Sequence, residues 1–140
     1  MNFAGLNAFG VFAAAGASFL FGGVWYGLLA NQWMAAADVD FDEMRKRSGH
    51  LVTLYVITLL AQIVMALVLA GTMGHLGPGQ VTVKNGIISG ALMWAGFVMP
   101  SLLVNHVFQG ARRSLTFIDG GHWLGVLLLQ GAIIGWLGVG

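Results

Sequence analysis

The sequence is poor in charge: only 8% of its residues are Asp, Glu, Lys or Arg, whereas a soluble domain carries about 25%. It has no cysteine, which excludes disulfides, thiol catalysis and thiolate metal ligands. Its net charge of +1 is too small to favour nucleic acid as a partner. Hydrophobic residues make up 58% of the chain. This composition predicts a protein whose main solvent is lipid.

Four long stretches lack Asp, Glu, Lys and Arg altogether: residues 3–29, 51–71, 86–108 and 121–139. Each has the ~20 residues needed to cross ~30 Å of hydrocarbon, and backbone polar groups in lipid must be satisfied within the segment. The sequence therefore predicts an all-α polytopic membrane protein. We expect a single transmembrane domain over residues 1–140, with four transmembrane helices in a bundle.

The basic residues lie mainly in two of the three predicted loops. Residues 45–47 and 112–113 are all basic, whereas Lys84 is the one basic residue between the second and third predicted helices. By the positive-inside rule, loops 30–50 and 109–120 are cytoplasmic and both termini lie on the non-cytoplasmic side.

The first loop contains a helix-start signal. Asp40 precedes Glu43 by three residues, which is the spacing of a capping box. Acidic residues come before basic ones, an order that suits the helix dipole. The pattern predicts a short interfacial helix over about residues 41–47.

Small and polar residues form a stripe along each predicted helix. The candidate polar residues of the interior are Gln62, Gln130, Trp25 and Trp94. Two interpretations stay open, because such residues either pack membrane helices together or line a substrate path near the bilayer centre.

Two further features of the helices bear on packing. Gly131, Gly135 and Gly138 lie on the face of the fourth helix away from His122. We expect this Gly-rich face to pack against a second subunit, which predicts a homo-oligomer. Pro100 should kink the third helix, because it lacks the N–H that would bond to the carbonyl of Gly96.

A cluster of polar side chains lies where the third predicted helix ends and the fourth begins. Asp119 suits the N-cap of the fourth helix and shares a face with His122 three residues later. The candidate ligand-binding residues at this membrane face are Trp33, Asn105, His106, Arg112, Arg113, Asp119 and His122.

Three interpretations of the cluster stay open. In the first, the residues cap helices and contact headgroups in a structural or partner-binding subunit without its own ligand. Alternatively, Arg112 and Arg113 hold the anionic group of a small solute or lipid, which the protein binds or transports near the cytoplasmic face. In the third, a divalent metal is bound, for which the candidate ligands are His50, His106, Asp119 and His122.

Enzyme activity and cofactors other than such a metal are not expected. The chain lacks cysteine and a Gly-x-Ser-x-Gly motif, so it has no nucleophile of the common hydrolase types. The expected partners are membrane lipids, further copies of the chain and a small-molecule ligand.

Three motifs resemble those of the DUF1761 family of small bacterial four-helix membrane proteins. They read "GGVWYGLLANQWM", "WAGFVMPSLLVN" and "FIDGGHWLGVLLLQGAIIGW" and together extend the resemblance over nearly the whole chain. The sequence departs from the family pattern at Gln109, where the family usually carries an acidic residue. The resemblance implies the four-helix fold, a location in the inner membrane of a bacterium and no particular activity.

Overall fold

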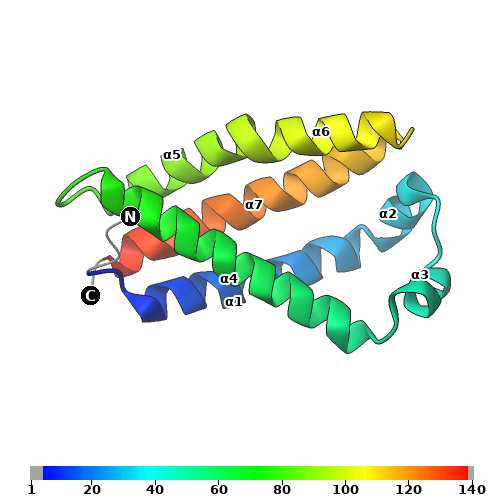
Figure 1. The fold of residues 1–140 in the computed structure, drawn as a ribbon, viewed down its shortest axis with the longest axis horizontal. Helices are drawn as coiled ribbons and strands as arrows, with labels where there is room; N and C mark the ends of the chain where they lie inside the picture. The colour runs from blue at the N-terminus through cyan, green and yellow to red at the C-terminus, as the bar shows by residue number, and fades with distance from the viewer. Residues whose placement is uncertain (1–4, 139–140) are drawn as a thin grey trace.

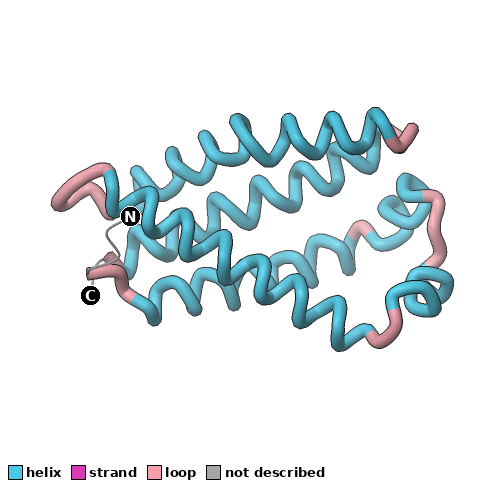
Figure 2. The backbone as a smooth tube through the Cα atoms, viewed as in Figure 1, coloured by secondary structure: helices cyan, strands magenta, loops and turns pink. Residues whose placement is uncertain are grey.

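The computed structural model describes residues 5–138, and every regular element within that range is helical (Figure 1). The helices are α1 (Ala8–Leu28), α2 (Ala30–Ala37), α3 (Phe41–Ser48), α4 (Leu51–His75), α5 (Val83–Met93), α6 (Met99–Phe108) and α7 (Arg113–Leu137), with a π-helical turn, η1 (Trp94–Val98), between α5 and α6. Only short connections separate them (Figure 2). Four helices are long and apolar enough to cross a membrane: Ala8–Leu28, Leu51–His75, Val83–Phe108 and Arg113–Leu137. The predicted all-α membrane protein with four spanning helices is confirmed.

The helix α7 is the one against which the other spans pack. In Figure 1 it runs between α1 and the α5–α6 pair, and α4 crosses in front of it. Its interior face is buried along its length, from Leu115 through Val126 to Ile134. Leu69 and Met73 of α4 complete the core at the end of the bundle where α4 meets α5 and α7.

The closest approach between helices joins α5 to α7 through glycine. A Cβ atom on Gly131 would overlap the carbonyl oxygen of Gly86, and a Cβ on Gly86 would overlap that of Gly131. Gly135 lies equally close to the backbone of Thr82. The prediction that the Gly131–Gly135 face packs against a second subunit is wrong, because α5 of the same chain occupies it.

Another pair of small residues faces outward. Gly23 and Gly27 of α1 have no neighbouring atom within 4 Å of a built Cβ. Self-association of the chain stays a prediction, and this face of α1 is open for it.

The third span contains Pro100 without breaking. The backbone widens into the π-helical turn Trp94–Val98 immediately before Met99 and Pro100, which open α6. In a π-turn each carbonyl accepts from the residue five positions on, as the Trp94 carbonyl does from the N–H of Met99, so the i+4 bonding pattern that a proline interrupts is already altered before Pro100. The expected disturbance at Pro100 thus takes the form of a π-turn.

The fourth span begins at Arg113 and not at residue 121, so the predicted start was wrong. Leu115 and Thr116 are buried in its first turn. Their burial stabilises helical structure before residue 121. The N-cap residue is Arg112, so Asp119 is not a cap but lies inside the helix, in its second turn. The connection to α6 shrinks to residues 109–112.

The predicted first loop is mostly helical. Asp40 is the N-cap of α3, and its side chain accepts a hydrogen bond from the N–H of Asp42 at 3.2 Å. The sequence did not predict α2, which follows α1 almost without interruption. Residues 3, 4 and 139, which belong to the predicted first and fourth spans, lie outside the described residues.

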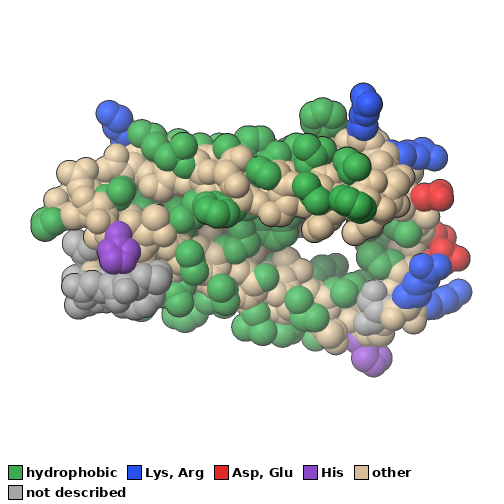
Figure 3. Space-filling view, turned by 45° about the horizontal axis from the view of Figure 1, so that its top comes forward, with side chains coloured by type: hydrophobic (Ala, Val, Ile, Leu, Met, Phe, Trp, Pro, Cys, Tyr) green, Lys and Arg blue, Asp and Glu red, His purple; other side chains and the backbone are tan. Residues whose placement is uncertain are grey.

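Charged side chains gather at one end of the bundle (Figure 3). We call it the charged end; it is formed by α2, α3 and residues 109–112. The sides of the molecule between its ends are covered largely by apolar side chains, such as Leu20, Val64 and Leu92. This distribution suits a bundle surrounded by lipid, with the charged end at the level of the headgroups.

Candidate functional site

Asp119 is the centre of a polar cluster near the charged end. Its Oδ1 accepts hydrogen bonds from the hydroxyl of Tyr26 at 2.7 Å and from the indole N–H of Trp33 at 3.2 Å. Its Oδ2 lies 3.8 Å from Nε2 of His106, and only 18% of the Asp119 side chain is exposed. Among residues 5–138, no Lys or Arg lies within ion-pair distance of this carboxyl group.

His106 links the cluster to a second residue of α7. Its Nδ1 lies 2.9 Å from the hydroxyl oxygen of Thr116, one turn before Asp119. The cluster therefore joins α1, α2, α6 and α7 through side-chain contacts. Because Trp33 belongs to α2, the contact with Asp119 also fixes this short helix against the spanning bundle.

Two tryptophans donate hydrogen bonds to the backbone of α7 beside Asp119. The indole N–H of Trp25 bonds to the carbonyl of Ile118 at 3.0 Å, and that of Trp94 bonds to the carbonyl of Gly120 at 2.8 Å. Both carbonyls belong to the turn that contains Asp119. Trp25 and Trp94 thus position this turn from opposite neighbouring helices, α1 and the third span.

Gln62 and Gln130 meet in the buried interior of the bundle. The Nε2 of Gln130 donates to the hydroxyl oxygen of Ser18 and to the backbone carbonyl of Gln62, both at 3.0 Å. The Ser18 hydroxyl lies 2.9 Å from Oε1 of Gln62. All three side chains are at most 1% exposed, so they hold α1, α4 and α7 together and line no open path within one chain.

The remaining predicted residues lie apart from Asp119. The ring of His122 faces α1, where the absence of a side chain at Gly22 makes room for it and the ring of Phe21 stacks on it at 6.1 Å. Asn105 is exposed on α6, and His50 is exposed at the start of α4. Within residues 5–138, no three His, Asp or Glu side chains form a group that could hold a metal ion.

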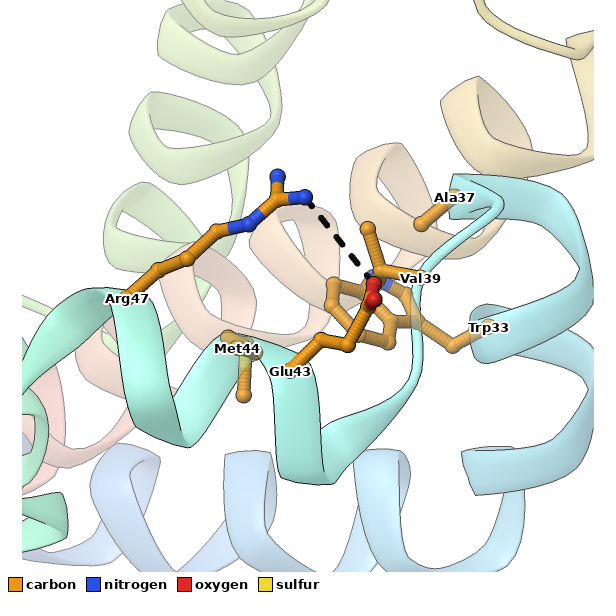
Figure 4. Close-up of a pocket in the computed structure, with 6 residues that line it drawn as sticks. All are labelled: Trp33, Ala37, Val39, Glu43, Met44 and Arg47. Atoms are coloured by element: carbon orange, nitrogen blue, oxygen red, sulfur yellow. Dashed lines mark ion pairs between the residues drawn. The ribbon is translucent and has the colours of Figure 1, made fainter.

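Two hollows open at the charged end. The first, the α3 hollow, has a volume of about 250 Å³ and is walled by Trp33, Ala37, Val39, Glu43, Met44 and Arg47. Figure 4 shows the indole of Trp33 beneath the ion pair between Glu43 and Arg47, whose charged atoms are 3.9 Å apart. An ion pair so exposed contributes little to stability. Since these two charges are already paired, this hollow has mainly apolar walls left for a ligand.

The second, the α2–α7 hollow, has a volume of about 330 Å³. Its walls are residues 36–38, residues 109–112 and Leu115. Both arginines are exposed, but Arg112 lines this hollow and Arg113 does not. The structure thus separates two arginines that the sequence treats alike.

A comparison with known protein families supports the resemblance that the sequence motifs indicate. A family model described as "Protein of unknown function (DUF1761)" matches residues 9–135, which is most of the chain. The chain belongs to the DUF1761 family. Comparison with curated proteins and with solved structures gave no match. The matched range contains the Asp119 cluster and both hollows of this DUF1761 protein.

Three residues of the candidate sites were not predicted from the sequence: Tyr26 and Thr116 of the Asp119 cluster, and Asp38 of the α2–α7 hollow. Tyr26 lies seven residues before Trp33, which is two helical turns, and this spacing could have placed both side chains on one face. Thr116 lies three residues before Asp119, but the sequence predicts a loop at Thr116, so the two side chains are not expected on one helix face. Nothing in the sequence alone predicts that Asp38 and Arg112 line the same hollow, since α2 and the 109–112 connection are far apart along the chain.

Proposed function

We propose that this DUF1761 protein binds, near the cytoplasmic face of the membrane, the anionic group of a lipid headgroup or small solute. The site is the α2–α7 hollow, and Arg112 is the residue that holds the anion. The supporting observation is that Arg112 lines this hollow and, within residues 5–138, has no carboxylate within ion-pair distance. An exposed guanidinium that belongs to a residue lining the hollow, and that has no ion-pair partner among the described residues, can bind a phosphate or carboxylate.

The start of α7 adds to this attraction. Arg112 is its N-cap residue and no side chain caps the helix, while Leu115 in the first turn lines the same hollow. The first N–H groups of a helix lack partners within the helix, and the helix dipole favours a negative charge beside them. An anion at Arg112 would therefore gain a second favourable interaction at the wall of the hollow.

The interior of the chain supports binding at this end over passage through the middle of one subunit. Gln62, Gln130 and Ser18 bond to one another across the bundle, and each is almost completely buried. Flux through a single chain would require these contacts to open. The alternative function, a structural or partner-binding subunit without a ligand, predicts no specific role for Arg112.

The test compares Arg112→Ala with Arg113→Ala as a matched control. Both changes remove one positive charge from the start of α7, so they alter net charge and the orientation signal equally. The protein is released from nanodiscs that contain phosphatidylglycerol, and retained lipid is measured by native mass spectrometry. We expect Arg112→Ala to lose retained lipid and Arg113→Ala to keep it. Equal retention in both variants would favour the structural subunit.

A further inference from the structure

Asp38 lines the same hollow as Arg112. It is the C-cap residue of α2 and, among residues 5–138, the only non-glycine residue with a left-handed backbone, at φ 55° and ψ 41°. Both Asp38 and Arg112 line the α2–α7 hollow. Among the described residues, neither forms an ion pair within 4.0 Å, so the two charges do not neutralise each other directly.

We propose that the α2–α7 hollow takes a zwitterion: an anionic phosphate or carboxylate at Arg112 and a primary ammonium at Asp38. This inference rests on the proposed function, because it keeps the anion at Arg112 and assigns the other half of the ligand. A ligand with only negative charge would meet the Asp38 carboxylate in the same small space. Like charges at close range repel, so the wall discriminates against simple anions.

The rest of the lining favours an ammonium that carries hydrogens. Gln109 lines the same hollow as Asp38, and its side-chain oxygen and the backbone carbonyls of the connection are acceptors of the kind that an N–H group needs. A quaternary ammonium is usually bound by aromatic faces, and no aromatic side chain lines this hollow. An ammonium with N–H groups can donate to Asp38 and to a neighbouring acceptor at once.

The size of the hollow also limits the ligand. A volume of about 330 Å³ is at the lower end of the ~300–1,000 Å³ found for small-molecule sites. The apolar side chains of its wall are mostly small: Ala36, Ala37, Ala111 and Leu115. It suits a short carbon linker between two opposite charges. Two ligands share this chemistry: the headgroup of phosphatidylethanolamine, and a free solute such as glycerophosphoethanolamine.

The experiment compares Asp38→Asn with Asp42→Asn as a matched control. Asn also adopts the left-handed backbone readily, so Asp38→Asn removes the charge and preserves the end of α2. Asp42 is an exposed acid in the first turn of α3 and lines neither hollow. Each protein is incorporated into nanodiscs with equal amounts of phosphatidylethanolamine and phosphatidylglycerol, and the retained lipids are identified by native mass spectrometry.

We expect the unchanged protein and Asp42→Asn to retain phosphatidylethanolamine preferentially. Asp38→Asn should lower that preference about tenfold, the effect of losing one hydrogen bond to a charged group. A preference that is unchanged in Asp38→Asn, or lowered equally in Asp42→Asn, would overturn the zwitterion. Arg112→Ala separates the two proposals: if it lowers retention of both lipids while Asp38→Asn changes no preference, the anion site stands and the zwitterion fails.

Calorimetry with glycerophosphoethanolamine in detergent distinguishes the source of the ligand. Binding that depends on both Asp38 and Arg112 shows that the headgroup chemistry alone is recognised, as a free solute would require. Retention of phosphatidylethanolamine without binding of the soluble headgroup identifies a lipid as the ligand. An equal affinity of the Asp38→Asn variant and the unchanged protein for the soluble headgroup, together with unaltered lipid preference, would refute the role of Asp38.

Discussion

Replacing Tyr26 by Phe removes one hydroxyl group from the centre of the Asp119 cluster. The hydroxyl donates to Oδ1 of Asp119 at 2.7 Å, the shortest contact that this carboxyl group makes among the described residues. Phe keeps the ring and its packing against His122, whose centroid is 4.8 Å from that of Tyr26. The change therefore tests the hydrogen bond with little effect on the surrounding volume.

The expected loss follows from the surroundings of the carboxylate. A hydrogen bond to a charged group contributes about 1.5–3 kcal/mol to stability, more than one between neutral groups. Trp33 still donates to the same oxygen after the change, and 18% of the Asp119 side chain remains exposed. We therefore expect Tyr26→Phe to lower the free energy of unfolding by about 2 kcal/mol, near the low end of that range.

A double-mutant cycle isolates this contact from other effects of the substitution. Tyr26→Phe, Asp119→Ala and the double variant are unfolded in mixed detergent and SDS, and helix content is followed by circular dichroism. The coupling energy between the two residues should be about 1.5–2 kcal/mol, since contacting residues couple by about 0.5–3 kcal/mol.

Tyr55→Phe is the matched control, because Tyr55 is the only other tyrosine. Its ring is 57% exposed on α4, and its hydroxyl has no hydrogen-bond partner among residues 5–138. We expect a change within about 0.5 kcal/mol for Tyr55→Phe and additive behaviour with Asp119→Ala. Equal losses for the two tyrosines, or a Tyr26–Asp119 coupling below about 0.5 kcal/mol, would refute the role of the cluster in holding α1 and α7 together.

Two further predictions concern the interior and use the same unfolding assay. Gly131→Ala should lower the free energy of unfolding by about 1–3 kcal/mol, the usual effect of overpacking, because its Cβ meets the carbonyl of Gly86. The control Gly23→Ala, whose Cβ meets open space, should leave the free energy of unfolding unchanged. Similar losses at both sites would contradict the α5–α7 contact. Gln62→Leu removes the Oε1 that lies beside the Ser18 hydroxyl but leaves the backbone carbonyl that accepts from Gln130. We expect a loss of about 0.5–1.5 kcal/mol, and no change at all would show that the Ser18–Gln62 contact does not form.

The coarse fold could be read from the sequence because lipid imposes strong constraints. Runs without charge predict spans, and each predicted span overlaps an observed one. The start of α7 was predicted too late in the chain, because hydropathy counts an acidic residue such as Asp119 as a charge whatever its hydrogen-bond partners are. Asp119 is tolerated within a span because Tyr26, Trp33 and His106 surround its carboxyl group, and these partners come from three other helices.

The site was predictable in its location but not in its pairings. Trp33, His106 and Asp119 were expected at one membrane face, and the structure brings them together. Their roles differ from those expected, since Asp119 caps no helix and His122 turns toward Gly22 of α1. Arg112 and Arg113 are adjacent in the sequence and identical in type. Only the structure at the start of α7 shows that Arg112, and not Arg113, lines the hollow.

The central position of α7 has a consequence for biosynthesis. Since α7 is the last of the four spans in the chain, it leaves the ribosome after α1, α4 and the α5–α6 span have been made. Before that moment Ser18 and Gln62 lack their partner Gln130, and Trp25 and Trp94 lack the carbonyls to which they donate. Until then α4 can contact α1 and α5, while the glycine face of α5 that α7 covers in the finished fold stays uncovered. Insertion of one helix then completes nearly all of the polar contacts between spans in a single late step.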